Sequence, residues 1–127
     1  MFKAILGYKK GMTRIFDPNG VAVPVTVIEA GPCTITQIKK QAKDGYSAVQ
    51  LGFGDVKPKS LSRAELGHLK RSGGSPVRHL KEFRVDAADG LKVGATVDCG
   101  VFEVGHTVNV TGISRGLGMA GTIKRHH

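Results

Sequence analysis

Alternating apolar and polar residues fill the first half of the chain and predict β-strands joined by short turns. Residues 12–16 and 21–27 form two such runs, separated by Asp17-Pro18-Asn19-Gly20. Proline sets the φ angle that a type I turn requires, and glycine permits the backbone conformation that closes the turn. The pattern therefore predicts a hairpin. Pro24 lacks an N–H group, so its strand is expected at a sheet edge or at an irregularity.

Two further extended segments follow the hairpin. Gly31-Pro32 interrupts the second strand, and residues 34–40 and 46–53 are then extended, with a turn at Asp44-Gly45 between them. Three apolar residues of the later segment share one face and are expected in the core: Val49, Leu51 and Phe53. A third and a fourth strand are thus predicted before residue 54.

The hydrophobic period changes in residues 60–73, which predict a short helix. Ser62 and Glu65 have the spacing of a capping box, and Leu61 and Leu66 stand at the positions of a hydrophobic staple. Isolated helices become marginally stable only at about 12–15 residues, so this one is expected to pack against the strands.

The remainder of the chain again indicates extended structure. Residues 78–85, 96–102 and 107–114 are predicted to be extended, with a turn at Gly105 between the last two. Val108 and Val110 are expected to face inward. The chain as a whole is therefore predicted to be mainly β, with a small helical insertion.

Charge is concentrated in particular segments. The 127 residues carry 19 Lys and Arg against 10 Asp and Glu, a formal net charge of +9. Residues 57–84 carry +6, residues 113–127 carry +3 without any acidic residue, and residues 85–112 between them carry −3. Basic clusters spread over several segments indicate a surface that neutralises phosphates, as nucleic-acid binding requires. The acidic segment is expected to face away from the nucleic acid.

The aromatic content limits which kind of nucleic acid the chain is expected to bind. The chain has two tyrosines, five phenylalanines and no tryptophan, which argues against a stacking platform for single strands. Neither a helix-turn-helix pattern nor an RNP-type pattern is present. The composition therefore favours structured RNA that is recognised by its shape and backbone.

A glycine-rich motif at residues 116–121 matches G-x-G-x-x-G. Only six residues follow it, which leaves no room for the helix and acidic residue of a dinucleotide site. Two alternatives stay open: a bend beside Arg115 and Lys124 whose backbone approaches a phosphate chain, or a bulge that turns a strand.

No enzymatic chemistry is indicated. The five histidines have no cysteine or carboxylate at ligand spacing, so neither a metal nor a cofactor is expected. G-x-S-x-G and P-loop motifs are absent. Cys33 and Cys99 lack C-x-x-C partners and are expected to be small buried residues. No apolar run approaches the ~20 residues that span a bilayer, which favours a soluble protein that is not secreted.

Several longer motifs occur together and in a fixed order. They are Ile5-Leu6-Gly7, Gly11-Met12-Thr13, residues 23–33, residues 44–54, Glu82-Phe83-Arg84-Val85, Val110-Thr111-Gly112 and Lys124-Arg125-His126. Together they closely resemble the bacterial and organellar form of ribosomal protein L three, a family of the large ribosomal subunit.

The resemblance implies a translation-protein-type β-barrel with a small α-helical insertion. It implies one domain over residues 1–127, a basic insertion at 57–84 and, at 114–127, the glycine-rich basic start of an extension. In the family this extension, followed by the strands that close the barrel, comes after the Lys-Arg-His motif. Both are therefore expected to be absent from these residues, and the domain to be incomplete.

The resemblance also implies a function. The expected role is that of a non-enzymatic structural constituent that binds large-subunit rRNA and supports subunit assembly and the peptidyl transferase region. Neighbouring ribosomal proteins are the expected partners, without a membrane or a small-molecule substrate, in the ribosome of the cytoplasm or of an organelle. The alternative is a translation factor, or its barrel domain, that binds ribosomes transiently.

Twelve candidate rRNA-contacting residues follow from the resemblance, position by position. They are Lys9, Lys10, Arg14, Lys70, Arg71, Arg78, His79, Arg84, Arg115, Lys124, Arg125 and His126. The family's Ser-basic-Gly-basic-Gly motif here reads Ser114-Arg115-Gly116-Leu117-Gly118. One phosphate contact is therefore expected to be lost at Leu117.

Overall fold

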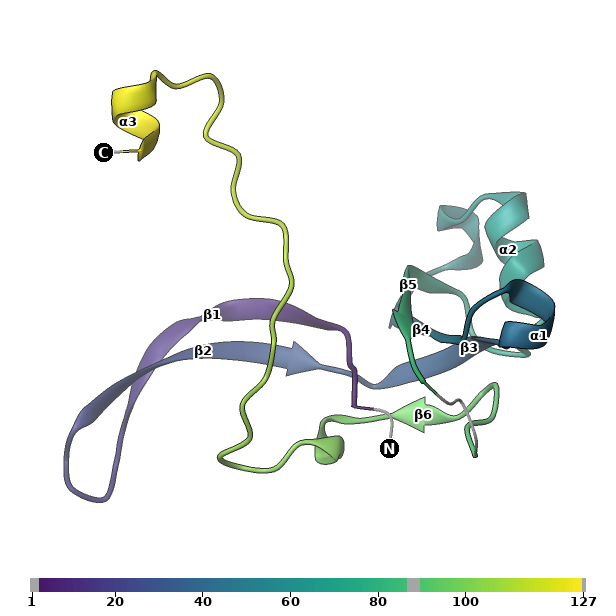
Figure 1. The fold of residues 1–127 in the computed structure, drawn as a ribbon, viewed down its shortest axis with the longest axis horizontal. Coiled ribbons are helices and arrows are strands. Elements are labelled where there is room, and N and C mark those ends of the chain that lie inside the picture. Colours follow the sequence, from purple (N-terminus) through teal and green to yellow (C-terminus); the bar gives the residue numbers. More distant parts are fainter. Residues whose placement is uncertain (1–2, 87–89, 127) are drawn as a thin grey trace.

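A computed structural model describes residues 3–86 and 90–126 of the chain. The fold is mainly β, as the sequence predicts (Figure 1). Its elements in chain order are β1 (Gly7–Phe16), β2 (Ala22–Ala30), β3 (Cys33–Lys39), α1 (Gln41–Asp44), β4 (Ala48–Asp55), η1 (Pro58–Ser60), α2 (Arg63–Lys70), β5 (Val77–Arg84), β6 (Thr96–Val97), η2 (Cys99–Val101) and α3 (Thr122–His126). Among the described residues, no helix has both the length and the apolar character needed to cross a membrane.

The strands form two separate antiparallel sheets. β1 pairs with β2, and the second sheet has the order β5-β4-β3-β6. Figure 1 shows the β1–β2 hairpin reaching away from the four-stranded sheet, which carries α1 and α2. Both sheets are open within the described residues, so closure into a barrel stays a prediction.

The predicted hairpin turn is confirmed. A carboxylate oxygen of Asp17 accepts hydrogen bonds from the N–H groups of Asn19 and Val21, each at 2.9 Å. Gly20 adopts a φ of 79°, a left-handed conformation that glycine tolerates without cost. Pro24 lies in β2, which has only β1 as a neighbour in the described sheets, so its expected place at a sheet edge is also confirmed.

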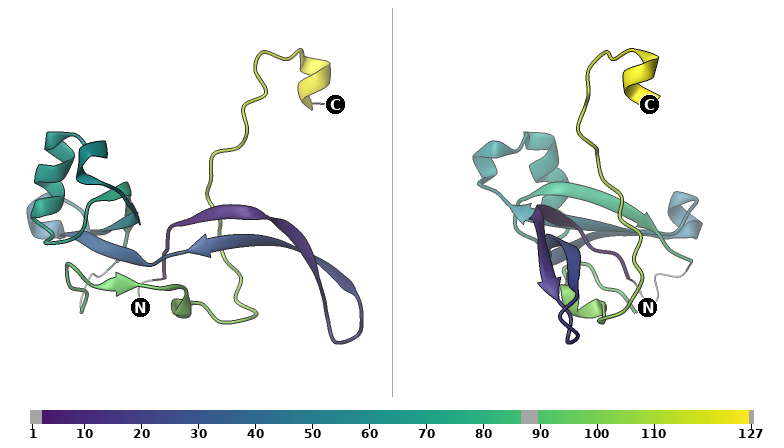
Figure 2. Two further views of the ribbon diagram at one scale, coloured as in Figure 1. Left: turned by 180° about the vertical axis from the view of Figure 1, so that it is seen from behind. Right: turned by 90° about the vertical axis from the view of Figure 1, so that its left-hand side faces the viewer.

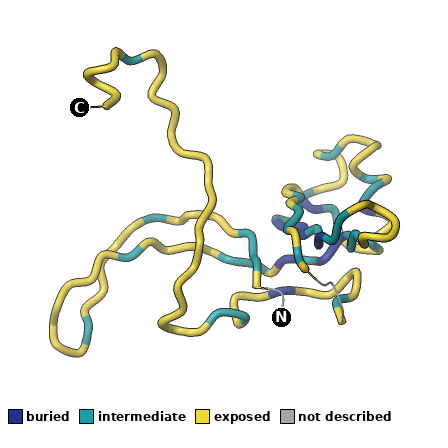
Figure 3. The backbone as a smooth tube through the Cα atoms, in the orientation of Figure 1, coloured by how far each residue is buried: buried dark blue, intermediate teal, exposed yellow. Residues whose placement is uncertain are grey.

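The core lies on one face of the four-stranded sheet. The buried cluster consists of Cys33, Ile35, Val49, Leu51, Phe53 and Val97. It contains all three residues that alternation assigned to the core. Ile5 and Leu6 from the N-terminal segment pack against this cluster, together with Leu91 and Val101. Figure 3 shows the burial concentrated in this sheet, whereas the hairpin is mostly exposed.

Helix α2 begins with the predicted capping box. The Ser62 N–H donates to Glu65 Oε2 at 2.8 Å, and the Glu65 N–H donates to Ser62 Oγ at 3.3 Å. Leu69 is the buried residue of the helix, which fits the expectation that so short a helix must pack on the sheet. The α-helix ends at Lys70 and a turn continues to Gly73, so the predicted extent is approximately right. α1 occupies the place of the predicted turn, with Gly45 at a φ of 78° as its cap.

The expectations for the C-terminal third need correction. Residues 96–102 form only the two-residue strand β6 and then the 3₁₀ helix η2. Residues 107–114 form no strand, and Val108 and Val110 are 52% and 73% exposed. Their alternation has no partner strand in the described part of the chain, so nothing holds them as a sheet. Residues 106–121 instead run away from both sheets toward α3 (Figures 1 and 2).

The two cysteines have different environments. Cys33 is fully buried, as expected, and its Sγ accepts a hydrogen bond from the Leu6 N–H at 3.4 Å. Cys99 is exposed, so the expectation that it is buried was wrong. It begins η2 at the surface, beyond the short strand β6 that reaches the core.

Candidate nucleic-acid interface

All twelve candidate residues are exposed. They fall into three groups, on strand β1, on the segment from the end of α2 through β5, and on the C-terminal segment. None of these side chains is used to fill the core, so each can reach a solvent-borne phosphate. Their contact with RNA stays a prediction.

The hairpin group consists of Lys9, Lys10 and Arg14. The strand register shifts between Lys9 and Gly11, which places Lys10 at a β-bulge. Lys10 Nζ lies 2.6 Å from Glu29 Oε2, with both side chains more than half exposed. An exposed ion pair of this kind contributes little to stability, so Lys10 can exchange its carboxylate for a phosphate at small cost.

The β5 group lies on the outer strand of the four-stranded sheet. Within residues 3–86 and 90–126, β5 pairs only with β4, in a register that sets Arg84 opposite Ala48 and His79 opposite Phe53. Because side chains alternate along a strand, Arg84 and His79 project from opposite faces of the sheet. The strand therefore presents basic groups in two directions.

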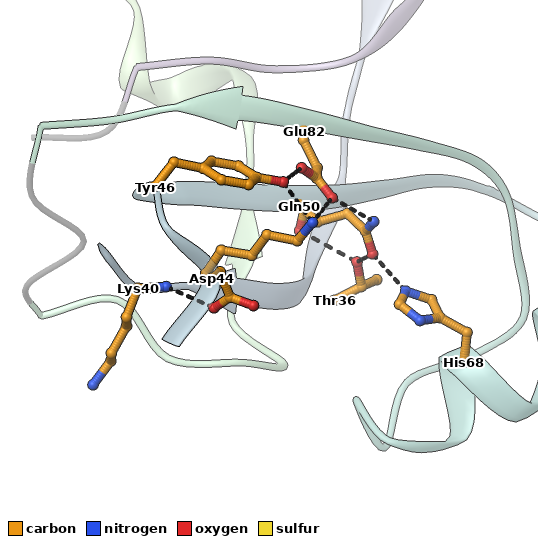
Figure 4. Close-up of polar contacts among 8 residues, drawn as sticks. Thr36, Lys40, Asp44, Tyr46, Gln50, His68 and Glu82 are labelled. Atoms are coloured by element: carbon orange, nitrogen blue, oxygen red, sulfur yellow. Dashed lines mark hydrogen bonds and ion pairs between the residues drawn. The ribbon is translucent and has the colours of Figure 1, made fainter. Parts of the chain in front are cut away.

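A polar network holds one end of β5 in place (Figure 4). Lys39 Nζ donates to Tyr46 Oη at 2.6 Å and lies 2.9 Å from Glu82 Oε1. Lys39 and Arg84 both approach the Tyr46 ring, at 5.0 and 5.4 Å from its centroid. Cation–π contacts of this kind orient the Arg84 guanidinium.

Lys39 and Glu82 form the ion pair of this network. The Tyr46 hydroxyl, and then the Glu82 carboxylate, raise the pKa of Lys39. The hydrogen bond from Lys39 is the main cause of the lowered pKa of Glu82. At neutral pH the pair is therefore fully ionised, and Lys39 is committed to Glu82 rather than free for a phosphate.

The same network joins α2 to the sheet. Gln50 Oε1 lies 2.8 Å from Thr36 Oγ1 and 2.8 Å from His68 Nε2. The Gln50 amide nitrogen donates to Glu82 Oε1 at 3.5 Å. Because the Gln50 oxygen can only accept, His68 Nε2 is the donor in this contact. His68 thus anchors helix α2 to the sheet. Residues 3–86 and 90–126 contain no group of three His, Cys, Asp or Glu side chains that could hold a metal ion.

The C-terminal group lies on the least enclosed part of the described chain. Arg115 is in the extended segment, and Lys124, Arg125 and His126 are in α3. A Cβ atom added at Gly116, Gly118 or Gly121 would meet nothing within 4 Å. The described residues form no strand here, so the bulge alternative for the glycine-rich motif finds no support. Close approach of this backbone to a phosphate stays a prediction.

Comparison with known proteins identifies the family. No protein-family model matches the chain. The chain is 52% identical over 128 residues to the large ribosomal subunit protein uL3 of Picosynechococcus sp., an alignment that covers 100% of this chain and 60% of the relative. It is 56% identical over 122 residues to the protein of the same name from Synechococcus sp. strain RCC307, covering 96% and 57%. The protein of that name from Heliobacterium modesticaldum is 54% identical over 125 residues, covering 98% and 60%.

This chain belongs to the uL3 family. It spans about three-fifths of the length of the curated uL3 relatives that it matches. The Picosynechococcus uL3 alignment extends over the whole chain, so the hairpin, the α2–β5 segment and the C-terminal segment all lie within uL3 sequence. The sequence-based resemblance is thereby confirmed.

The structure adds one basic residue to the candidate set. Lys81 is exposed on β5, opposite Leu51, and strand alternation places it on the same face as His79. The resemblance did not single it out. Its position in the sequence could have indicated it. Lys81 lies two residues after His79 within the +6 segment, and residues two apart in a strand share the same face.

Proposed function

We propose that this chain is a non-enzymatic structural constituent of the large ribosomal subunit and binds rRNA directly. The observation that carries the proposal is the exposure of all twelve candidate side chains, in three groups far apart along a chain of net charge +9. The name of the relatives, large ribosomal subunit protein uL3, supports the same role. Within the subunit, we infer support of assembly and of the peptidyl transferase region.

The binding mechanism is electrostatic. Lys and Arg side chains neutralise rRNA phosphates and release the counterions condensed on them, which drives association. The bulged hairpin, the outer strand β5 and the extended C-terminal segment can contact phosphates at separated points of a folded RNA. The −3 segment at residues 85–112 is expected to face away from the RNA.

Salt dependence of binding tests this mechanism. We expect the affinity of the chain for purified bacterial large-subunit rRNA to fall steeply with salt, with a log–log slope of about 0.7–0.9 per phosphate contact. Arg115→Ala and Lys124→Ala should each weaken binding and reduce the slope by about that amount. Lys92→Ala is the matched control, because it removes one exposed charge from the acidic segment. Binding independent of salt, or equal slopes for all three variants, would overturn the mechanism.

A second experiment tests whether the chain is a permanent constituent of the large subunit or a translation factor that binds transiently. A structural constituent sediments with the large subunit through a high-salt wash, whereas a transiently bound translation factor is released. Location on ribosomes of the cytoplasm or of an organelle follows from the same proposal.

A further inference from the structure

A pocket of about 360 Å³ lies where the β1–β2 hairpin meets the four-stranded sheet. Its lining includes Tyr8 and Glu29 from the hairpin, and Thr34, Phe53 and Asp55 from β3 and β4. This volume falls in the range of about 300–1,000 Å³ that small-ligand sites occupy. We propose that the pocket receives one unpaired nucleobase of the bound RNA, of a kind that bears an exocyclic amino group. The inference rests on the proposed function and names a specific contact within it.

An aromatic wall provides the surface on which a base can stack. The Tyr8 ring centroid lies 5.0 Å from that of Phe53 and 5.6 Å from that of His79, with the His79 ring edge-on. Phe53 supports Tyr8 from the core, and Tyr8 remains 41% exposed. Seven aromatic residues are too few for a platform along a strand, but a single supported ring suffices for one base.

Gly54 lies between the Tyr8 ring and two candidate phosphate-binding residues, Arg78 and His79. Gly54 has a φ of 77°, and a Cβ atom there would lie 3.2 Å from Tyr8 Oη, 3.7 Å from His79 Cδ2 and 3.9 Å from Arg78 Cβ. Arg78 and His79 therefore lie beside Gly54, outside the pocket lining but next to it. A nucleotide whose base stacks on Tyr8 would have its phosphate within reach of these two side chains.

A carboxylate in the lining selects the base. Glu29 is held by Lys10, whereas Asp55 forms no ion pair within residues 3–86 and 90–126. A carboxylate accepts hydrogen bonds from the amino groups of adenine, cytosine or guanine, and uracil has none to offer. Asp55 is thus the residue of the pocket lining that favours amino-bearing bases.

The tyrosine fluorescence of the chain offers a direct readout, because the chain has no tryptophan and only two tyrosines. With oligoadenylate and oligouridylate 12-mers as probes, we expect oligoadenylate to quench the Tyr8 emission and to bind more tightly. Tyr8→Leu should lower oligoadenylate affinity about 5- to 150-fold, the range that corresponds to the loss of one base–aromatic stack. Tyr8→Phe keeps the ring and should bind like the parent chain. Asp55→Asn should lower the ratio of oligoadenylate affinity to oligouridylate affinity, because a neutral amide oxygen accepts hydrogen bonds more weakly than a carboxylate.

The outcomes separate this inference from the proposed function. If Tyr8→Leu and Asp55→Asn bind both oligonucleotides like the parent chain, while large-subunit rRNA still binds with a steep salt slope, the nucleobase pocket is overturned and rRNA binding stands. Failure of the parent chain to bind any RNA would instead overturn the proposed function. Quenching by an arginine-rich peptide, with none by oligoadenylate, would assign the pocket to a basic protein segment and overturn the nucleobase.

Discussion

The Tyr46 hydroxyl donates a hydrogen bond to Glu82 Oε2 at 2.8 Å. The two residues lie 36 positions apart, one in the turn before β4 and the other on the outer strand β5. The contact joins the segment before β4 to β5, the outer strand that carries Arg78, His79 and Arg84. Since Arg84 approaches the same tyrosine ring, the bond also orients a candidate rRNA contact.

Tyr46→Phe should lower the free energy of unfolding by about 1–2 kcal/mol. The change leaves Lys39 and Glu82 in place and removes one hydrogen bond to a carboxylate and one from an ammonium group. Urea denaturation followed by circular dichroism measures the effect. Tyr8→Phe is the matched control, since no hydrogen bond of the Tyr8 hydroxyl is found within the described residues, and equal denaturation midpoints for the two variants would contradict the role of the network.

Stability should depend on pH through Glu82. Its pKa is lowered in the folded chain, chiefly by Lys39, so its contribution is present above the ordinary glutamate pKa of about 4.3 and is lost as pH falls through the folded value. The raised pKa of Lys39 acts oppositely: its contribution is present below the ordinary lysine pKa of about 10.4 and is lost as pH rises through the folded value. Glu82→Gln should therefore flatten the acid limb of a urea-midpoint profile. Glu103→Gln, at a carboxylate that is 82% exposed, should leave that limb unchanged.

Local signals in the sequence predicted the elements that depend on local chemistry. The hairpin turn follows from Asp17 and Gly20, and the start of α2 follows from Ser62 and Glu65, because each pair interacts within four residues. The exposure of the candidate site residues is likewise implied by their charge, since Lys and Arg are rarely buried unless they are paired.

Features that depend on distant contacts could not be predicted in this way. Residues 107–114 alternate like a strand, yet alternation does not reveal whether a partner strand lies beside them. Cys99 resembles Cys33 in type, but only the three-dimensional fold shows that one lies in the core and the other at the surface. The pocket beside Tyr8 is formed by residues from both sheets, so its aromatic wall has no signature in one segment.

The difference between the cysteines predicts selective thiol modification. In the native chain, a maleimide should label Cys99 and leave Cys33 unmodified, because Cys33 is fully buried and burial raises the pKa of its thiol. Intact-mass measurement should show one adduct under native conditions and two in urea. Cys99→Ser should abolish native labelling, and rapid double labelling of the native chain would contradict the observed burial.

Two glycines should respond in opposite directions to replacement by alanine. Gly67 lies inside α2, has no positive φ and leaves open space for a Cβ, so Gly67→Ala should stabilise the chain by about 0.5–1 kcal/mol through helix propensity. Gly54 has a φ of 77° and its added Cβ would press to 3.2 Å from Tyr8 Oη, so Gly54→Ala should destabilise the chain by about 1 kcal/mol or more. Thermal and urea unfolding of the two variants against the parent chain measures both effects. Stabilisation by both changes would mean that the left-handed turn beside Tyr8 relaxes freely, and that the contact between the Tyr8 and His79 rings does not depend on glycine.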